Sequence, residues 1–295
     1  MLVYVKLCAM ALFWGGTFVA GRLVSKDVGP FAASFLRFAI ASACLVWIMR
    51  RREGGLPMLR AGQVVPAILL GLTGVFAYNA LFFYGLQTVH AGRAAVIVAC
   101  NPMLTALLAG LFFKEPLPGR KIAGICLSVC GAAVAIGRGN PAALFTDALS
   151  VGDVAIVGCV ASWVAYSLLG KRAMRDMAPQ AAVTWSCVFG TLALAVPAFA
   201  EGMAEQWAVY PPIAWICLAY LAVCGTVLGF TWFYEGVKAI GAGRAAVFIN
   251  FVPVTAILFG WLLLGEPLPW SLLAGGGMVC CGVYLANSLG NGARR

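Results

Sequence analysis

Charged side chains are scarce in this chain of 295 residues, since Asp, Glu, Lys and Arg together make up 10% of it and histidine occurs once. A soluble domain carries roughly 25% charged residues, so this chain has too little charge to cover a water-facing surface. Hydrophobic residues make up 63%, and the mean hydropathy is +0.96. This composition excludes an ordinary soluble enzyme and predicts a protein whose solvent is mainly lipid.

Several chemical motifs are missing as well. The sequence has no Gly-x-x-x-x-Gly-Lys-Ser/Thr loop, no His-Glu-x-x-His and no Cys-x-x-Cys pair among its eleven cysteines. We therefore expect no ATP-driven transport within the chain, no metal, no cofactor and no disulfide. An intramembrane enzyme would need a nucleophile, base or metal cluster at membrane depth. Because no such cluster of His, Asp and Glu is visible, we expect that the protein is not an enzyme.

The sequence does contain apolar runs long enough to cross a bilayer, which takes roughly 20 residues each. In hydrocarbon the backbone must satisfy its own hydrogen bonds, so runs of this length predict helices. The fold class expected is an all-α polytopic membrane protein with ten transmembrane helices. The predicted spans are 4–24, 31–50, 64–87, 91–113, 119–137, 151–169, 179–200, 212–235, 243–264 and 270–288.

Basic residues indicate the orientation. The net charge is +10, but the basic residues form short clusters between apolar runs, which is typical of a topology signal and not of nucleic-acid binding. Fifteen of the twenty Lys and Arg residues fall on the predicted side that carries both termini, four fall on the other, and Arg37 lies inside the second span. The bias predicts that both termini lie in the cytoplasm.

An internal repeat is the strongest single feature. Ala91-Gly92-Arg93-Ala94-Ala95-Val96 recurs 151 residues later at 242–247, and Glu115-Pro116-Leu117-Pro118 recurs at 266–269. An odd number of spans per half reverses the direction of the second copy. We therefore predict two inverted five-helix repeats, residues 1–143 and 144–295, as found in many secondary transporters.

Matched glycines and prolines are candidate hinges, because glycine weakens a helix and a mid-helix proline removes a backbone hydrogen bond. Close helix packing is the alternative explanation for the glycines, and a packing kink without a ligand is the alternative for the prolines. Matched Gly124/Gly275 and Gly131/Gly282 form small faces on the fifth and tenth helices, which suits tight helix packing, either within the chain or at a dimer interface. The six predicted hinge residues are Gly74, Gly85, Pro102, Gly225, Gly236 and Pro253.

Aromatic and amide side chains within the predicted bundle are candidates for substrate contacts. Mid-membrane Trp and Tyr are unusual, because lipid-facing ones prefer the interfaces. A role in core packing or in helix–helix hydrogen bonding is the alternative for each of them. The predicted substrate-binding residues are Trp14, Tyr78, Asn79, Phe82, Asn101, Trp163, Tyr166, Trp185, Phe230 and Asn250.

Charges inside the predicted spans are few. Arg37 is expected to extend to the interface or to pair with a helix end, and Glu235 is expected to pair with Lys238. Glu266 is interpreted as a helix stop or as a loop anchor. Since no other charge lies at mid-membrane, we predict that a zwitterionic substrate would be held by neutral dipoles, with broad specificity.

The ordered motifs resemble the drug/metabolite transporter superfamily, of the EamA type. The resemblance rests on Phe13-Trp14-Gly15-Gly16, Arg37-Phe38, the repeated Ala-Gly-Arg-Ala-Ala, and the two Glu-Pro-Leu segments. It covers nearly the whole chain and implies a ten-helix exporter in a plasma (bacterial inner) membrane, most similar to bacterial amino-acid exporters. The expected partners are a small-molecule substrate and membrane lipid, with no nucleic acid, in a monomer or weak homo-oligomer. Transport of other metabolites or drugs, or a channel or scaffold role, are the alternatives.

Overall fold

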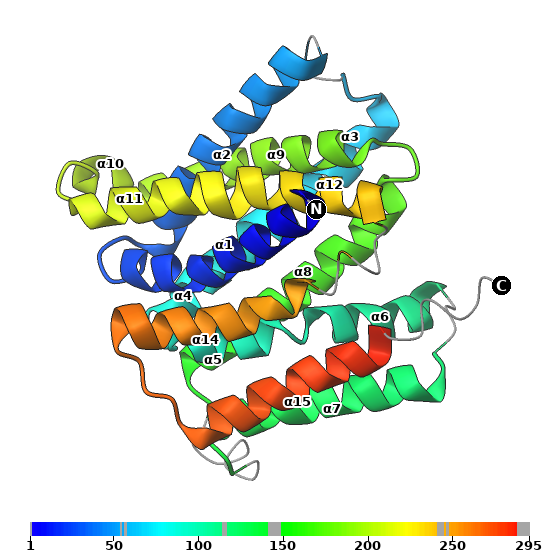
Figure 1. Cartoon of the computed structure of the whole chain (residues 1–295). Coiled ribbons are helices and arrows are strands. Elements are labelled where there is room, and N and C mark those ends of the chain that lie inside the picture. Colours follow the sequence, from blue (N-terminus) through cyan, green and yellow to red (C-terminus); the bar gives the residue numbers. More distant parts are fainter. Residues whose placement is uncertain are drawn as a thin grey trace.

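The computed structural model describes residues 2–53, 55, 58–113, 117–140, 149–240, 245 and 248–287. Within these residues all regular structure is helical (Figure 1). Eight helical stretches are long and apolar enough to cross a membrane, and Phe251–Leu264 and Trp270–Leu285 are shorter apolar helices. The predicted class, an all-α polytopic protein with ten membrane helices, is confirmed.

The first five predicted spans correspond to seven α-helices and one π-helix. Short connections that contain Pro or Gly separate the spans, as in Gly29-Pro30, because proline and glycine interrupt helical hydrogen bonding. These elements are α1 (Leu2–Val24), α2 (Pro30–Glu53), α3 (Ala61–Leu70), η1 (Gly71–Ala77), α4 (Tyr78–Leu86), α5 (Ala91–Val98), α6 (Asn101–Phe113) and α7 (Gly119–Ile136).

The remaining spans follow the same plan, with a short helix, α10, between the seventh and eighth. Residues 243, 244, 246 and 247 of the predicted span 243–264 lie outside the described residues, and α14 covers 251–264. The elements are α8 (Val151–Ala173), α9 (Pro179–Ala200), α10 (Met203–Gln206), α11 (Pro212–Tyr220), η3 (Leu221–Leu228), α12 (Gly229–Ile240), α14 (Phe251–Leu264) and α15 (Trp270–Asn287).

Two π-helical segments interrupt the third and eighth spans at matching places. Residues 71–77 form η1 and residues 221–228 form η3, which agrees with the sequence offset of 151 to within a residue. A π-helix loosens the regular backbone ladder and frequently marks a functional site. The predicted hinge residues Gly74 and Gly225 lie inside these two segments.

The packing of the helices repeats with the two halves exchanged. Helix α1 packs against α11, η3, α12 and α14, and α8 correspondingly packs against α3, η1, α4, α5 and α6. Helix α2 contacts α9, and α7 contacts α15, so that these pairs join equivalent helices of the two halves. In Figure 1 the α7–α15 pair lies at one edge of the bundle, away from α2 and α9.

The α7–α15 pair is held by close backbone approach. A Cβ atom on Gly131 would lie 2.6 Å from the Gly275 carbonyl oxygen, and one on Gly282 would lie 2.5 Å from the Gly124 carbonyl oxygen. The Ser128 hydroxyl donates to the Val279 carbonyl across the same contact. Of the two interpretations of these four glycines, tight packing within the chain fits this geometry.

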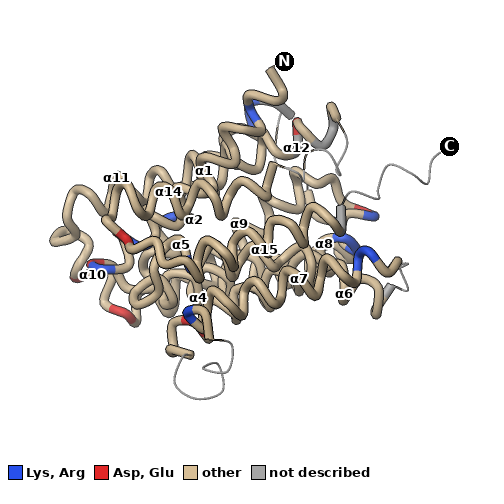
Figure 2. The backbone as a smooth tube through the Cα atoms, turned by 60° about the horizontal axis from the view of Figure 1, so that its bottom comes forward, with Lys and Arg blue, Asp and Glu red and all other residues tan. Residues whose placement is uncertain are grey.

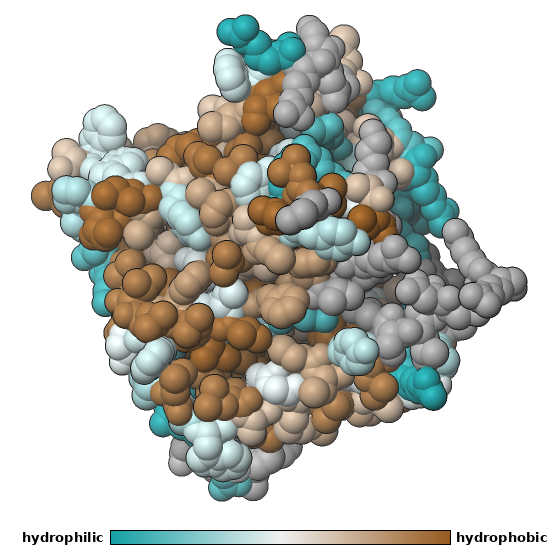
Figure 3. All heavy atoms as spheres, in the orientation of Figure 1, coloured by the Kyte–Doolittle hydropathy of each residue, from teal (hydrophilic) through white to brown (hydrophobic). Residues whose placement is uncertain are grey.

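The surface matches a protein in lipid. Large apolar side chains are widely exposed, among them Phe112, Val196 and Leu263 at 72%, 77% and 68%. Figure 3 shows apolar side chains spread over much of one face, with hydrophilic ones mainly at its margins. In Figure 2 a group of Lys and Arg lies at one end of the bundle, around α6 and α8. An uneven distribution of this kind is what topology signals produce.

Candidate functional site

A cavity lies where α2, η1, α4, α8, α9 and α12 meet, near the middle of the spans. About 50 Å³ of it is open to the centre of a water molecule, which is room for a few waters. Its wall combines polar and aromatic side chains. The lining residues are Arg37, Phe38, Gly74, Val75, Tyr78, Asn79, Trp163, Tyr166, Val183, Ser186, Cys187 and Phe230.

Arg37 is the charged residue of this wall. Its side chain is 8% exposed, and its guanidinium donates from Nη1 to Asn79 Oδ1 at 2.9 Å and from Nη2 to Thr226 Oγ1 at 3.3 Å. The Arg37 Nε–H is buried and has no hydrogen-bond partner among the described residues. The expectation that Arg37 extends to the interface or pairs with a helix end is therefore wrong.

Asn79 and Thr226 connect Arg37 to the two π-helical segments. Asn79 Nδ2 donates to the carbonyls of Val75 at 2.9 Å and Gly74 at 3.3 Å, both in η1. Thr226 lies in η3 and donates its hydroxyl to the Leu221 carbonyl at 3.2 Å. Helix carbonyls that lose their regular partners need others when they are buried. One guanidinium on α2 thus bridges side chains that belong to the interrupted spans of both halves.

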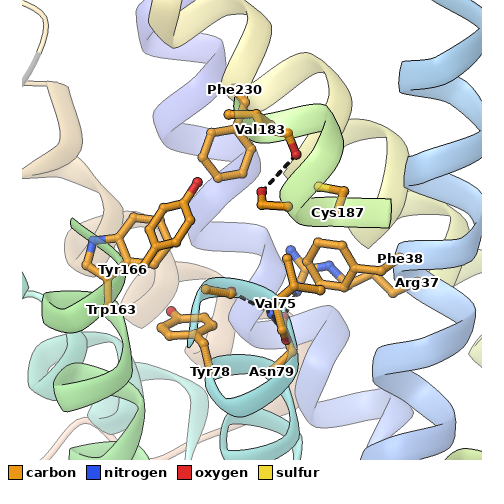
Figure 4. A pocket seen from close by; sticks show the side chains of 12 residues that line it. Arg37, Phe38, Val75, Tyr78, Asn79, Trp163, Tyr166, Val183, Cys187 and Phe230 are labelled. Atoms are coloured by element: carbon orange, nitrogen blue, oxygen red, sulfur yellow. Dashed lines mark hydrogen bonds between the residues drawn. The ribbon is translucent and has the colours of Figure 1, made fainter. Parts of the chain in front are cut away.

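Aromatic rings form the opposite side of the cavity. Tyr78 and Trp163 have ring centroids 5.4 Å apart, and Trp163 and Tyr166 are 5.3 Å apart. Figure 4 shows these three rings facing Arg37 and Phe38 across the cavity, with Phe230 closing a third side. The Arg37 guanidinium carbon lies 5.1 Å from the centre of the Phe38 ring. The site therefore presents one fixed cation opposite a set of aromatic faces.

The structure brings five of the ten predicted substrate residues to this wall, and their role in binding stays a prediction. These five are Tyr78, Asn79, Trp163, Tyr166 and Phe230. The sequence reasoning missed Ser186, Cys187 and Phe38, as well as the inward position of Arg37. The sequence did contain a signal for the inward position of Arg37, because a cation within a membrane span usually faces the bundle interior.

The other five predicted residues lie outside the lining. Trp14 donates from Nε1 to the Gly225 carbonyl at 2.9 Å, and Phe82 packs in the core against Phe18. Trp185 stacks on Phe189. Asn101 is 6% exposed, with Oδ1 unpartnered among the described residues, and the Asn250 carbonyl accepts from the Cys280 thiol.

The six predicted hinge residues lie in different surroundings. Gly74 lines the cavity, and a Cβ there would collide with the Tyr166 ring. Gly225 is not among the lining residues, and a Cβ there would lie 2.7 Å from Thr17 Cγ2 and 3.5 Å from Arg37 Nη2. Gly85 and Gly236 sit in α4 and α12 and pack against the side chains of Ile156 and Leu7. Pro102 follows the break between α5 and α6, and Pro253 is buried in α14.

At the end of the bundle near α10, polar contacts join the two halves. Arg93 on α5 pairs with Asp153 on α8 at 2.8 Å, and the Asp153 side chain is 1% exposed. Glu266 accepts hydrogen bonds from the backbone amides of Ala91 at 2.9 Å and Gly92 at 3.3 Å. Of the two interpretations of Glu266, the loop anchor fits this geometry. Asp153 was not singled out from the sequence.

Another carboxylate joins helices at this end. Glu201, which follows α9, accepts from the backbone amide of Ala32 in the first turn of α2 at 2.7 Å. Burial raises the pKa of Glu201 above its ordinary value, and hydrogen bonds from the amides of Ala32 and Phe31 offset part of this rise. The helix N-terminus favours a negative charge at this position.

At the opposite end the contact between the halves is more exposed. Lys6 on α1 and Glu235 on α12 form an ion pair at 2.6 Å, with side chains 29% and 40% exposed. Lys6 is the partner that the structure describes for Glu235, and the expected pairing with Lys238 involves a side chain that lies outside the described residues. The partner comes from a distant part of the sequence, which local spacing could not reveal.

The fold and cavity define a polytopic membrane protein that encloses a small polar and aromatic site within the bilayer. The EamA-like transporter family matches residues 1–137 and again residues 150–288. The chain therefore belongs to the EamA-like transporter family, within the drug/metabolite transporter superfamily, and the resemblance seen in its motifs is confirmed. Its function is that of a membrane transporter.

Relatives cover nearly the whole chain. It is 29% identical over 287 residues to the uncharacterized transporter YyaM of Bacillus subtilis, covering 97% of this chain and 94% of the relative. It is also 29% identical over 288 residues to a probable terminal-alkyne amino-acid exporter of Streptantibioticus cattleyicolor, covering 96% and 92%. A solved crystal structure with 20% identity superposes with a TM-score of 0.66 over 99% of this chain and 98% of that one, which shows the fold alone.

Proposed function

We propose that this transporter exports amino acids or related small amphipathic metabolites by alternating access around the central cavity. The observation that carries the proposal is the cavity wall itself, where Arg37 faces the rings of Tyr78, Trp163 and Tyr166. Apolar walls with a few placed polar groups are typical of small-molecule sites. The relative named as a probable amino-acid exporter supports the same substrate class. On this proposal the protein is a transporter and not an enzyme.

We further propose that residues 1–143 and 144–295 are inverted repeats that rock against each other. The exchanged packing of α1 and α8, and the two π-helical segments at the same offset, support this division. The cavity of about 50 Å³ has room for only a few waters, whereas ligand pockets usually measure about 300–1,000 Å³. Admitting an amino acid therefore requires movement of the surrounding helices.

The proposed function predicts amino-acid transport by the purified protein. Reconstituted proteoliposomes should take up labelled aromatic and branched-chain amino acids above the level of empty liposomes, measured with and without an imposed pH gradient. A dependence on the gradient would identify proton coupling, and uptake without it would identify facilitated diffusion. Uptake equal to that of empty liposomes for every amino acid tested contradicts the proposal.

The hinge proposal predicts a large effect at Gly74. A methyl group there collides with the Tyr166 ring, and a packed ring cannot move aside as a flexible chain end can. Gly74→Ala should lower the initial transport rate at least about tenfold, a barrier increase of roughly 1.4 kcal/mol. Gly55→Ala is the control, because no atom lies within 4 Å of its added Cβ. Equal rates in the two variants count against a moving element at Gly74.

The orientation remains a proposal that labelling can test. We propose that both termini lie in the cytoplasm of a bacterial inner membrane, which puts the exposed residue Ala204 of α10 on the outer side and Gly55 on the inner side. In intact cells, Ala204→Cys should gain reaction with an impermeant thiol reagent above the background of the native cysteines, and Gly55→Cys should not. The reverse pattern would invert the assigned topology.

A further inference from the structure

The buried guanidinium of Arg37 has more donors than partners. It carries five N–H donors and stays protonated. The hydrogen bonds to Asn79 and Thr226 use two of these donors, and Nε–H is left without a partner. Both acceptors are neutral, and no carboxylate of the described residues forms an ion pair with Arg37. A charge in this position is costly unless something compensates it during function.

The cavity places this unpaired charge where a ligand would lie. Arg37 lines the cavity and is more than nine-tenths buried. A guanidinium and a carboxylate match geometrically, since two parallel N–H donors face two oxygens. The rings of Tyr78, Trp163 and Tyr166 can pack an apolar side chain and can attract an ammonium group weakly through their faces. The described lining contains no acidic group that would bind an ammonium strongly.

We propose that Arg37 is the carboxylate-binding residue of the transporter, and that the carboxylate is the required feature of its substrate while the amino group is dispensable. The inference rests on the proposed function and narrows it from amphipathic metabolites to carboxylic acids with an apolar side chain. N-acylated amino acids, which keep the carboxylate and lose the positive charge, therefore belong among the ligands. Amino-acid esters, which keep the ammonium and lose the negative charge, do not.

Equilibrium binding to the full-length protein in lipid nanodiscs tests this inference. The probes are phenylalanine, N-acetylphenylalanine and phenylalanine methyl ester, titrated calorimetrically, with the corresponding leucine compounds as a second set. Wild-type protein should bind the amino acid and its N-acetyl derivative about ten- to a hundredfold more tightly than the ester, as expected for a charge-assisted hydrogen bond. Arg37→Gln should reduce this preference to about threefold or less.

Matched variants separate recognition from folding. Arg37→Lys keeps the charge but loses the planar pair of donors, so it should retain an intermediate preference. Arg22→Gln is the control and should keep the wild-type preference, because Arg22 donates to the Leu86 carbonyl and is not part of the cavity lining. If Arg37→Gln does not fold, Arg37→Lys and the comparison of acid with ester on the wild-type protein still test whether the carboxylate is required.

The outcomes distinguish this inference from the proposed function. Equal binding of ester and acid by wild type, or no binding of any carboxylate, overturns the role of Arg37. Uptake of amino acids with an unchanged acid preference in Arg37→Gln supports the transport proposal and overturns the inference. Binding of N-acetyl acids without binding of free amino acids supports the inference and contradicts amino-acid export.

Discussion

Asp153→Asn is expected to lower the free energy of unfolding by about 3–5 kcal/mol, because it removes the counter-charge of a cation that is mostly shielded from solvent. Arg93 Nη2 lies 2.8 Å from Asp153 Oδ2, and the two side chains are 13% and 1% exposed. After the substitution Arg93 keeps its hydrogen bond to the Ile136 carbonyl but loses its anionic partner. Asp153 also accepts hydrogen bonds from the amide and hydroxyl of Ser150 at the start of α8.

Glu235→Gln is the matched control for this prediction. The Lys6–Glu235 pair also joins the two halves, but its side chains are 29% and 40% exposed, and exposed pairs contribute about 0–1 kcal/mol. The thermal unfolding midpoint in detergent should fall strongly for Asp153→Asn and little for Glu235→Gln. Equal shifts would show that burial does not set the strength of these pairs.

A double substitution checks the physical cause. If the loss in Asp153→Asn comes from an unpaired buried charge, then Arg93→Met combined with Asp153→Leu should recover most of the unfolding midpoint, because apolar side chains replace both partners. A double variant as unstable as the single one would assign the loss to the helix cap at Ser150 instead.

Asn79→Leu has the second large expected effect, a loss of about 3–5 kcal/mol in the free energy of unfolding. The substitution removes the acceptor of the Arg37 guanidinium and the donor to the carbonyls of Gly74 and Val75. A buried charge would lose one of its two neutral partners, and two helix carbonyls would lose theirs. Transport should fall as well, because the same bonds hold η1 at the cavity wall.

Asn101→Leu is the matched control, since it makes the same change at an equally buried site. Asn101 is 6% exposed and Asn79 is 2% exposed, but Asn101 Oδ1 accepts no hydrogen bond from the described residues. Replacing a poorly satisfied buried polar group with an apolar one is often near neutral, so the change should stay within about 1 kcal/mol. If thermal unfolding in detergent ranks the two variants in the reverse order, the Arg37–Asn79 link is not a main stabilising contact.

The helical architecture could be predicted from the sequence because bilayer thickness and backbone hydrogen bonding leave few choices. Runs of about 20 apolar residues must be helices, so the spans were located to within a few residues. The glycine pairs of α7 and α15 were predicted correctly for a similar reason, since small residues repeated at helical spacing permit close approach. The π-helical form of η1 and η3 was not predicted, because apolar periodicity does not distinguish it from an α-helix.

The site could be predicted only in part. Tyr78, Asn79, Trp163, Tyr166 and Phe230 line the cavity, and a polar or aromatic residue at mid-membrane was the signal that located them. The same signal also selected Trp14, Trp185 and Asn101, which lie elsewhere. Residue type and membrane depth do not show which way a side chain points around its helix axis, because almost every face of these helices is apolar. Helix rotation decides which side chains face the cavity.

The solvent of this protein, its ten apolar spans, its internal repeat and its family could all be read from the chain, because they depend on composition, run length and order along it. The partners of its charges became visible only in the folded bundle. Arg37 bonds to Asn79 and Thr226, and Asp153 pairs with Arg93, across separations of 42 to 189 residues. Pairing at such separations depends on how helices are rotated and packed, and chain order does not encode that directly.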